Sequence, residues 1–122
     1  MTKLHHIALG ATDVEEVARF YREVFELDEL TRHVYDDGAL RSIWLDLGGA
    51  ILMVERTEAA GEPVVGIGAG PFLLAFSVKP SKREAMEATL ERWGAQVEER
   101  TAYTSYARDP EGNRVAISHY PD

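Results

Sequence analysis

The sequence contains no cysteine, few basic residues and no long hydrophobic run. Without cysteine the chain has no disulfide, no thiolate metal site and no cysteine nucleophile. It suits a reducing compartment, so we expect a cytoplasmic protein. Thirteen Lys and Arg stand against 21 Asp and Glu, which gives a net charge of -8. This balance argues against nucleic acid as a partner, because phosphate neutralisation needs a basic face. Residues 1–13 lack an apolar run typical of a signal peptide or membrane span, so we expect no membrane association.

The composition that remains is that of an ordinary globular domain. Hydrophobic residues make up 45% of the 122 residues and charged residues 28%. A chain of this length buries roughly two-thirds of its unfolded surface, which is enough to fold without disulfides or a structural metal. We therefore expect one domain spanning residues 1–122.

The first half of the chain predicts a strand, a helix and three more strands. Residues 4–10 are apolar enough for a mostly buried strand. A capping box of Thr12 with Glu15, or of Asp13 with Glu16, predicts the start of a helix. Apolar residues at helical spacing then follow, namely Val14, Val17, Tyr21 and Val24. Extended segments are expected at about 29–35, 40–47 and 50–55.

The second half predicts the same order of elements. A strand is expected over residues 72–78, and Ser81 with Glu84 forms a further capping box. Met86, Leu90 and Trp93 give the apolar stripe of a second helix, which Gly94 ends. Three strands should follow, over 96–100, 103–108 and 113–119. Residues 57–71 are rich in glycine and proline and are interpreted as a linker.

The two halves also match residue by residue, which indicates an internal duplication. His6-Ile-Ala-Leu aligns with Leu73-Leu-Ala-Phe, and Leu52-Met-Val aligns with Val115-Ala-Ile. Each half would place one helix over one face of a four-stranded sheet and leave the other face bare. The predicted fold is therefore α+β, with two tandem βαβββ modules (residues 1–56 and 72–122) that form a shared concave cavity between sheets.

These segments resemble a known superfamily. HHIALGATD with FYREVFEL in the first half, and LLAFSV with DPEGNRVAIS in the second, are similar to the vicinal oxygen chelate superfamily. It contains the glyoxalases, the fosfomycin- and bleomycin-resistance proteins and the extradiol dioxygenases. The resemblance covers nearly the whole chain and implies paired βαβββ modules around a cavity, very often in a dimer.

The resemblance also locates the positions at which many family members hold a divalent metal. His6 matches the ligand of the first strand. The other three ligand positions fall on Met53, Leu73 and Ala116, which carry no group suited to a hard divalent ion. One imidazole does not hold a metal at useful affinity, so we expect no metal site and no cofactor. A displaced metal held by His6 and Glu55 is the alternative.

The face lining the predicted cavity supplies the candidate site residues. Tyr106 and Thr104 share one side of their strand, and we interpret Arg41 and Ile43 as their counterparts in the first half. Trp44 is expected to pack between helix and sheet, and His5 to point away from His6. The candidate ligand-binding residues are His6, Arg41, Ile43, Met53, Glu55, Leu73, Thr104, Tyr106 and Ala116.

These residues favour a metal-independent protein that binds or sequesters a small molecule. The mostly apolar wall with few polar groups predicts a planar or aromatic ligand. One alternative is an enzyme, a lyase or isomerase that uses His6 with Glu55 or Tyr106 as general acid and base. Another is a structural or interaction domain whose cavity is filled by its own side chains. A homodimer is expected in each case, because a four-stranded unit leaves a bare face and unpaired edges.

Overall fold

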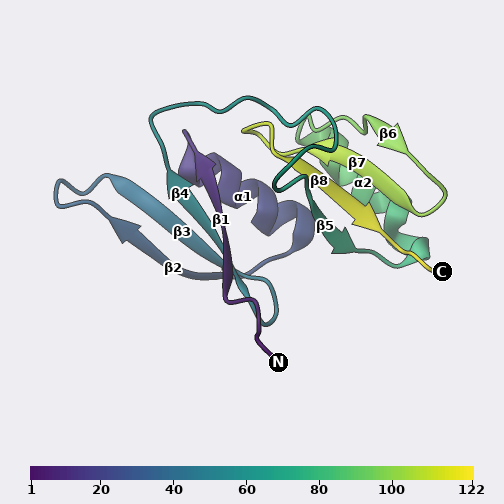
Figure 1. The fold of residues 1–122 in the computed structure, drawn as a ribbon, viewed down its shortest axis with the longest axis horizontal. Coiled ribbons are helices and arrows are strands. Elements are labelled where there is room, and N and C mark those ends of the chain that lie inside the picture. The colour runs from purple at the N-terminus through teal and green to yellow at the C-terminus, as the bar shows by residue number, and fades with distance from the viewer. The chain divides into compact units, whose positions relative to one another are not determined.

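The order of strands and helices repeats in the two halves of the chain (Figure 1). The computed structural model describes residues 1–122. The first half forms β1 (His6–Ala11), α1 (Val14–Phe25), β2 (Glu29–Val34), β3 (Leu40–Asp46) and β4 (Ile51–Arg56). The second half forms β5 (Leu74–Ser77), the short 3-10 helix η1 (Pro80–Lys82), α2 (Arg83–Arg92), β6 (Glu99–Arg100), β7 (Thr104–Arg108) and β8 (Arg114–Ser118). The predicted α+β fold of two βαβββ modules is confirmed.

The sheet registers reproduce the internal duplication. The strand order is β1-β4-β3-β2 in the first sheet and β5-β8-β7-β6 in the second. In each sheet the first and last strands of the module pair in parallel, and the other pairs are antiparallel. Ala8 pairs with Met53, and Ala75 pairs with Ala116. These are the equivalent positions in the aligned sequences, so the two halves share one register.

Helix α1 forms where the sequence predicts it and buries its apolar stripe. The Asp13 side chain caps the helix by accepting a hydrogen bond from the backbone N–H of Glu16 at 3.0 Å. The helix packs on β3 and β4. Each fully buried apolar side chain contributes about 1.5–3 kcal/mol relative to an exposed one. The buried residues are Val14, Val17, Ala18, Phe20, Tyr21 and Val24.

The start of the second helix differs from the prediction. Ser81 does not cap α2, because it lies inside η1, where the backbone is already helical. The N-cap of α2 is Lys82, whose side chain makes no capping hydrogen bond. The end agrees with the prediction, since Gly94 adopts a left-handed backbone with φ 75° just after the helix.

A buried arginine joins α2 to its sheet. Arg83 is 5% exposed, and its Nε donates to the hydroxyl of Ser105 at 3.0 Å. Its Nη atoms donate to three backbone carbonyls, those of Thr101 and Ala102 in the loop before β7 and of Thr104 at the start of β7. Because burying a guanidinium is costly unless every donor is satisfied, these bonds fix the helix in one position on the sheet.

The chain divides into two compact units, Met1–Gly61 and Glu62–Asp122. The boundary falls within the segment 57–71 that the sequence suggests is a linker. The later part of this segment is bound to the second unit, since Arg108 Nη2 donates to the carbonyl of Val64 at 2.6 Å.

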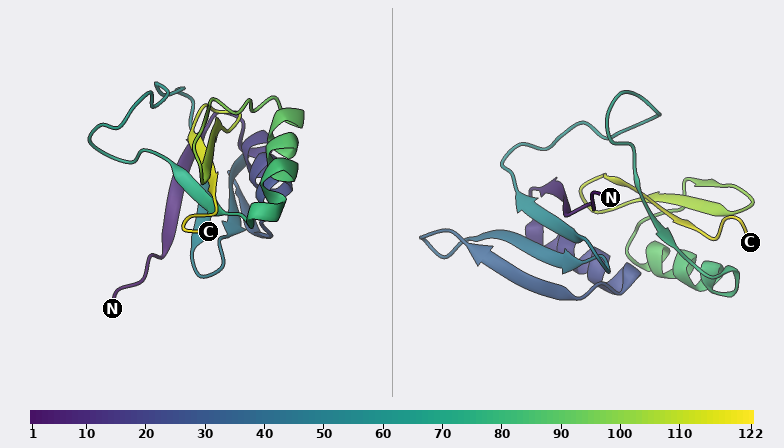
Figure 2. Two further views of the ribbon diagram at one scale, coloured as in Figure 1. Left: turned by 90° about the vertical axis from the view of Figure 1, so that its right-hand side faces the viewer. Right: turned by 60° about the horizontal axis from the view of Figure 1, so that its bottom comes forward.

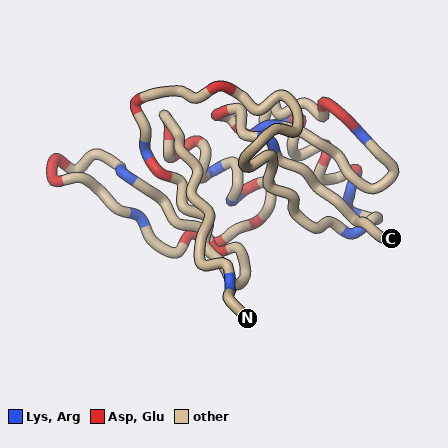
Figure 3. Tube along the Cα trace, viewed as in Figure 1, with Lys and Arg blue, Asp and Glu red and all other residues tan.

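The surface charges agree with an acidic protein. Figure 3 shows acidic and basic positions interspersed along the trace, with no continuous basic stretch. Neither helix has the length and apolar character needed to cross a membrane.

Candidate functional site

Each sheet has one face covered by its helix and one face without a helix, which we call the open face. Figure 2 shows each helix on one side of its own sheet. Cross-strand pairing assigns side chains to the two faces, because directly paired residues point to the same side. The open face of the first sheet carries His6, Ala8, Gly10, Thr31, His33, Ser42, Trp44, Asp46, Ile51, Met53 and Glu55.

Three rows of side chains cross this open face. The first row contains His6, Ile51 and Asp46. The middle row contains Ala8, Met53, Trp44 and Thr31. The third row contains Gly10, Glu55, Ser42 and His33. The middle row is mostly apolar, and the third row carries three polar side chains.

The predicted placement of Arg41 and Ile43 on this face is wrong. Ile43 pairs with Val54 and is fully buried on the helix side, and alternation places Arg41 on the same side. The first-half counterpart of Tyr106 is Trp44, because Tyr106 pairs with Ala116 just as Trp44 pairs with Met53. Both faces of β3 carry apolar residues, so alternation in the sequence did not fix which side each one faces.

The counterpart of Thr104 is Ser42, because Thr104 pairs with Ser118 at the position where Ser42 pairs with Glu55.

Trp44 does not lie between helix and sheet as predicted. Its ring lies on the open face beside His33, with the ring centroids 4.7 Å apart.

Three polar atoms on the open face are buried and have no hydrogen-bond partner. They are Nε2 of His33, Oγ of Ser42 and Nε1 of Trp44. Ser42 is only 1% exposed. Buried polar atoms are nearly always paired in native proteins, so three unpaired atoms on one face are unusual. None of these three residues is among the site residues predicted from the sequence.

His6 lies at one end of this face and contacts His5. Their Nδ1 atoms are 2.9 Å apart, so one ring donates a hydrogen bond to the other. The prediction that His5 points away from His6 is wrong, because β1 begins only at His6 and strand alternation does not apply to His5.

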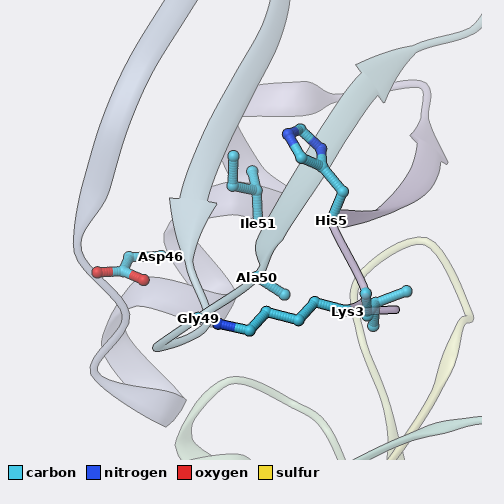
Figure 4. Close-up of a pocket in the computed structure, with 7 residues that line it drawn as sticks. Lys3, His5, Asp46, Gly49, Ala50 and Ile51 are labelled. Atoms are coloured by element: carbon cyan, nitrogen blue, oxygen red, sulfur yellow. The ribbon is translucent and has the colours of Figure 1, made fainter. Parts of the chain in front are cut away.

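A hollow of about 390 Å³ lies beside His5. It is lined by Lys3, Leu4, His5, Asp46, Gly49, Ala50 and Ile51. Its polar groups do not converge, since the carboxylate of Asp46 points away from Lys3 and His5 (Figure 4).

His6 and Glu55 are too far apart to act together. Glu55 pairs with Gly10, four residues beyond His6 on the parallel strand β1. At 3.3 Å per residue this places them about 13 Å apart along the strands. This separation disfavours both a direct acid–base pair and a shared metal ion for these two residues.

The open face of the second sheet holds Tyr106 in a fixed environment. The guanidinium carbon of Arg114 lies 4.8 Å from the centre of the Tyr106 ring and 4.9 Å from that of Phe72. Arg114 in turn pairs with Glu99 at 3.2 Å. The same face carries Ala75, Ser77, Thr104, Arg108, Ala116 and Ser118. Thr104 and Ser118 hydrogen-bond to each other through their hydroxyls at 2.9 Å.

The residues at the family's metal positions do not fit a divalent ion. Met53 lies in the apolar row of the first sheet, and Ala116 lies opposite Tyr106 in the second. Leu73 directly precedes β5. Neither unit brings together three or more His, Asp or Glu side chains that could hold a metal.

Comparisons with solved structures show the same fold. The chain superimposes on the fosfomycin resistance protein FosX from Listeria monocytogenes, as an E126Q mutant complexed with Mn(II) and 1S,2S-dihydroxypropylphosphonic acid. The TM-score is 0.81 at 14% identity, over 97% of this chain and 92% of that one. For lactoylglutathione lyase from Agrobacterium tumefaciens the TM-score is 0.68 at 22% identity, over 98% and 95% of the two chains. For TioX from Micromonospora sp. ML1 it is 0.68 at 22% identity, over 98% and 99%.

Comparison of the sequence with family models identifies the family. No curated protein sequence matches the chain significantly. The family model described as a glyoxalase-like domain matches residues 6–118, which is nearly the whole chain and includes both modules. With the duplicated βαβββ fold and the solved structures that share it, this match shows that the chain belongs to the glyoxalase-like domain family of the vicinal oxygen chelate superfamily.

Proposed function

We propose that this protein binds or sequesters a small molecule on the open faces of its sheets and does so without a resident metal ion. The observation that carries the proposal is the composition of the open face of the first sheet, where the apolar side chains of Met53 and Trp44 lie beside the polar side chain of Glu55. A face that is mostly apolar and carries a few polar side chains has the composition of a small-molecule site.

The side chains on these faces favour a planar or aromatic ligand. Trp44 and Tyr106 offer flat rings, and Met53 beside Trp44 is adaptable in shape and favours aromatic contacts. Ala8, Ala75 and Ala116 are small and leave room above the sheets. The lack of cysteine supports a reducing compartment, so we propose the cytoplasm as the place where the protein acts.

Fluorescence of Trp44 tests the binding function. The chain has two tryptophans, so the substitution Trp93→Phe leaves Trp44 as the single reporter. We expect planar aromatic compounds to quench or shift the Trp44 emission with saturable binding. A panel that leaves this emission unchanged at millimolar concentration would contradict the proposal and favour a domain whose faces are covered by protein.

The metal-independence is tested separately by elemental analysis of protein expressed without a His-tag. The expected content is far below one Mn, Fe, Ni or Zn per chain, because Met53, Leu73 and Ala116 offer no suitable donors. One metal per chain that disappears in the His6→Ala variant would overturn this part of the proposal.

A further inference from the structure

We infer that the ligand carries a positive charge, as a protonated amine, and that Glu55 with Trp44 recognises this charge on the open face of the first sheet. The inference rests on the proposed binding function and adds the chemical class of the ligand.

The charges of the open face are all negative. Its acidic residues are Asp46 and Glu55, and it carries no Lys or Arg. The carboxylate of Asp46 already accepts a hydrogen bond from the backbone N–H of Gly48 at 2.7 Å. Glu55 makes no ion pair, because the adjacent Arg56 faces the other side of β4 and pairs with Glu58 at 3.2 Å. Glu55 is therefore the free carboxylate of this face.

An aromatic ring lies within reach of that carboxylate. Glu55 pairs directly with Ser42, and Trp44 follows two residues later on β3. Diagonal neighbours of this kind are about 7 Å apart, so a cation bound to Glu55 also approaches the indole ring. Tryptophan is the best aromatic partner for a cation, within about 6 Å of its ring centre.

The carboxylate of Glu55 also selects among amines. It accepts hydrogen bonds from the N–H groups of a primary or secondary ammonium. A quaternary ammonium lacks such donors, so the arrangement favours a primary or secondary amine.

An anionic ligand would find no Lys or Arg on the open face of the first sheet. The arginines on the open face of the second sheet are already engaged by acidic side chains. Arg108 pairs with Glu98 at 3.1 Å, and Arg114 pairs with Glu99 at 3.2 Å. A carboxylate or phosphonate would instead face the unpaired Glu55, which repels it.

The test uses three aromatic probes that have similar shape and differ in charge. They are 2-phenylethylamine, 2-phenylethanol and 3-phenylpropanoate, titrated against the full chain with Trp44 as reporter. We expect the amine to bind about tenfold more tightly than the alcohol, because a hydrogen bond to a charged group is stronger than a neutral one. The carboxylate probe should bind most weakly.

The Glu55→Gln variant isolates the charge at the site. It should reduce the affinity for the amine about tenfold and leave the alcohol unchanged. Glu23→Gln on α1 is the matched control, since it removes the same charge from an exposed residue on the helix side of the sheet. The control should leave the affinity for the amine unchanged.

The outcomes separate the two proposals. Equal affinity for all three probes, or tighter binding of the carboxylate probe, overturns the inference and leaves the binding function in place. The same loss of amine affinity in Glu55→Gln and Glu23→Gln also overturns it, because the effect is then one of net charge. If none of the probes changes Trp44 emission, the proposed binding function fails together with the inference.

Discussion

Tyr106 lies on the open face of the second sheet and contacts Arg114. The guanidinium of Arg114 lies over its ring, and Arg114 is held by Glu99 and is 9% exposed at its side chain. A ring held in this way loses little conformational freedom when a ligand stacks on it, so the entropic cost of binding is smaller.

Replacing Tyr106 with Ala should weaken the binding of a planar ligand by about 1–3 kcal/mol, the range for loss of an aromatic stacking partner. Isothermal titration with a panel of planar aromatic compounds measures the change. Tyr106→Phe is the control, since it keeps the ring and should retain most of the affinity. An unchanged affinity in Tyr106→Ala would place the ligand away from the second sheet.

Glu87 on α2 supports stability in a pH-dependent way. Burial alone raises the pKa of its carboxyl group, but hydrogen bonds from Ser105 and Arg100 and the charges of Arg100 and Arg83 outweigh burial and lower the pKa below its ordinary value. A carboxyl group whose pKa is lower in the folded state stabilises the fold above its unfolded pKa of 4.5. This stabilisation is lost as the pH falls through the lower, folded value.

The Glu87→Gln variant should therefore be less stable than the wild type at pH 7, and the difference should shrink as the pH falls below 4.5. Urea unfolding followed by circular dichroism at pH 7 and at several acidic values measures the free energy of unfolding. A difference that is constant across this range would show that Glu87 contributes through packing alone.

At the scale of elements, the two helices are held in different ways. Helix α1 begins at a side-chain cap and is fixed by an apolar stripe, in which Phe20 and Tyr21 are fully buried. Helix α2 lacks a side-chain cap and buries only Arg83 and Leu90. The loss of apolar burial in α2 is offset by the polar contacts of Arg83 and Glu87 with the second sheet.

This difference predicts unequal losses of stability for two alanine substitutions, one at each capping box expected from the sequence. Asp13→Ala should destabilise the fold by about 1 kcal/mol, because the N–H of Glu16 loses its acceptor. Ser81→Ala should have almost no effect, since Ser81 is exposed and does not cap α2. Thermal and urea unfolding of both variants give the comparison. Equal destabilisation would show that Ser81 does cap α2.

At the scale of the whole molecule, we expect the exposed edges of the sheets to favour self-association. Each sheet has one face without a helix, and its outer strands, β1 and β2 or β5 and β6, expose unpaired backbone groups at their outer edges. Unpaired strand edges favour association with another strand or another copy. Homo-oligomers of soluble proteins are most often symmetric dimers.

We therefore expect a homodimer, with a mass twice the 13.6 kDa of one chain. Size-exclusion chromatography with light scattering measures the mass at micromolar concentrations. The mass of a single chain throughout a dilution series from high to low micromolar concentration would contradict this expectation.

The sequence by itself determined the architecture, because the signals for it are local and repeated. Asp13 and the apolar stripe that begins at Val14 predicted α1, and Gly94 predicted the end of α2. The alignment of Ala8 with Ala75 and of Met53 with Ala116 predicted the common register of the two sheets. The resemblance to the superfamily further implied that three of its metal positions lack suitable donors in this chain.

Only the tertiary structure decided which side chains share a face. Strand β3 is apolar on both sides, so Trp44 and Ser42 could be assigned to the open face, and Ile43 and Arg41 to the helix face, only after β3 was paired with β4. The orphaned atoms of His33, Ser42 and Trp44 and the free carboxylate of Glu55 became visible in the same way. A hydrogen-bond partner, or the lack of one, depends on side chains that are distant in sequence, and these distances are set when the strands pair.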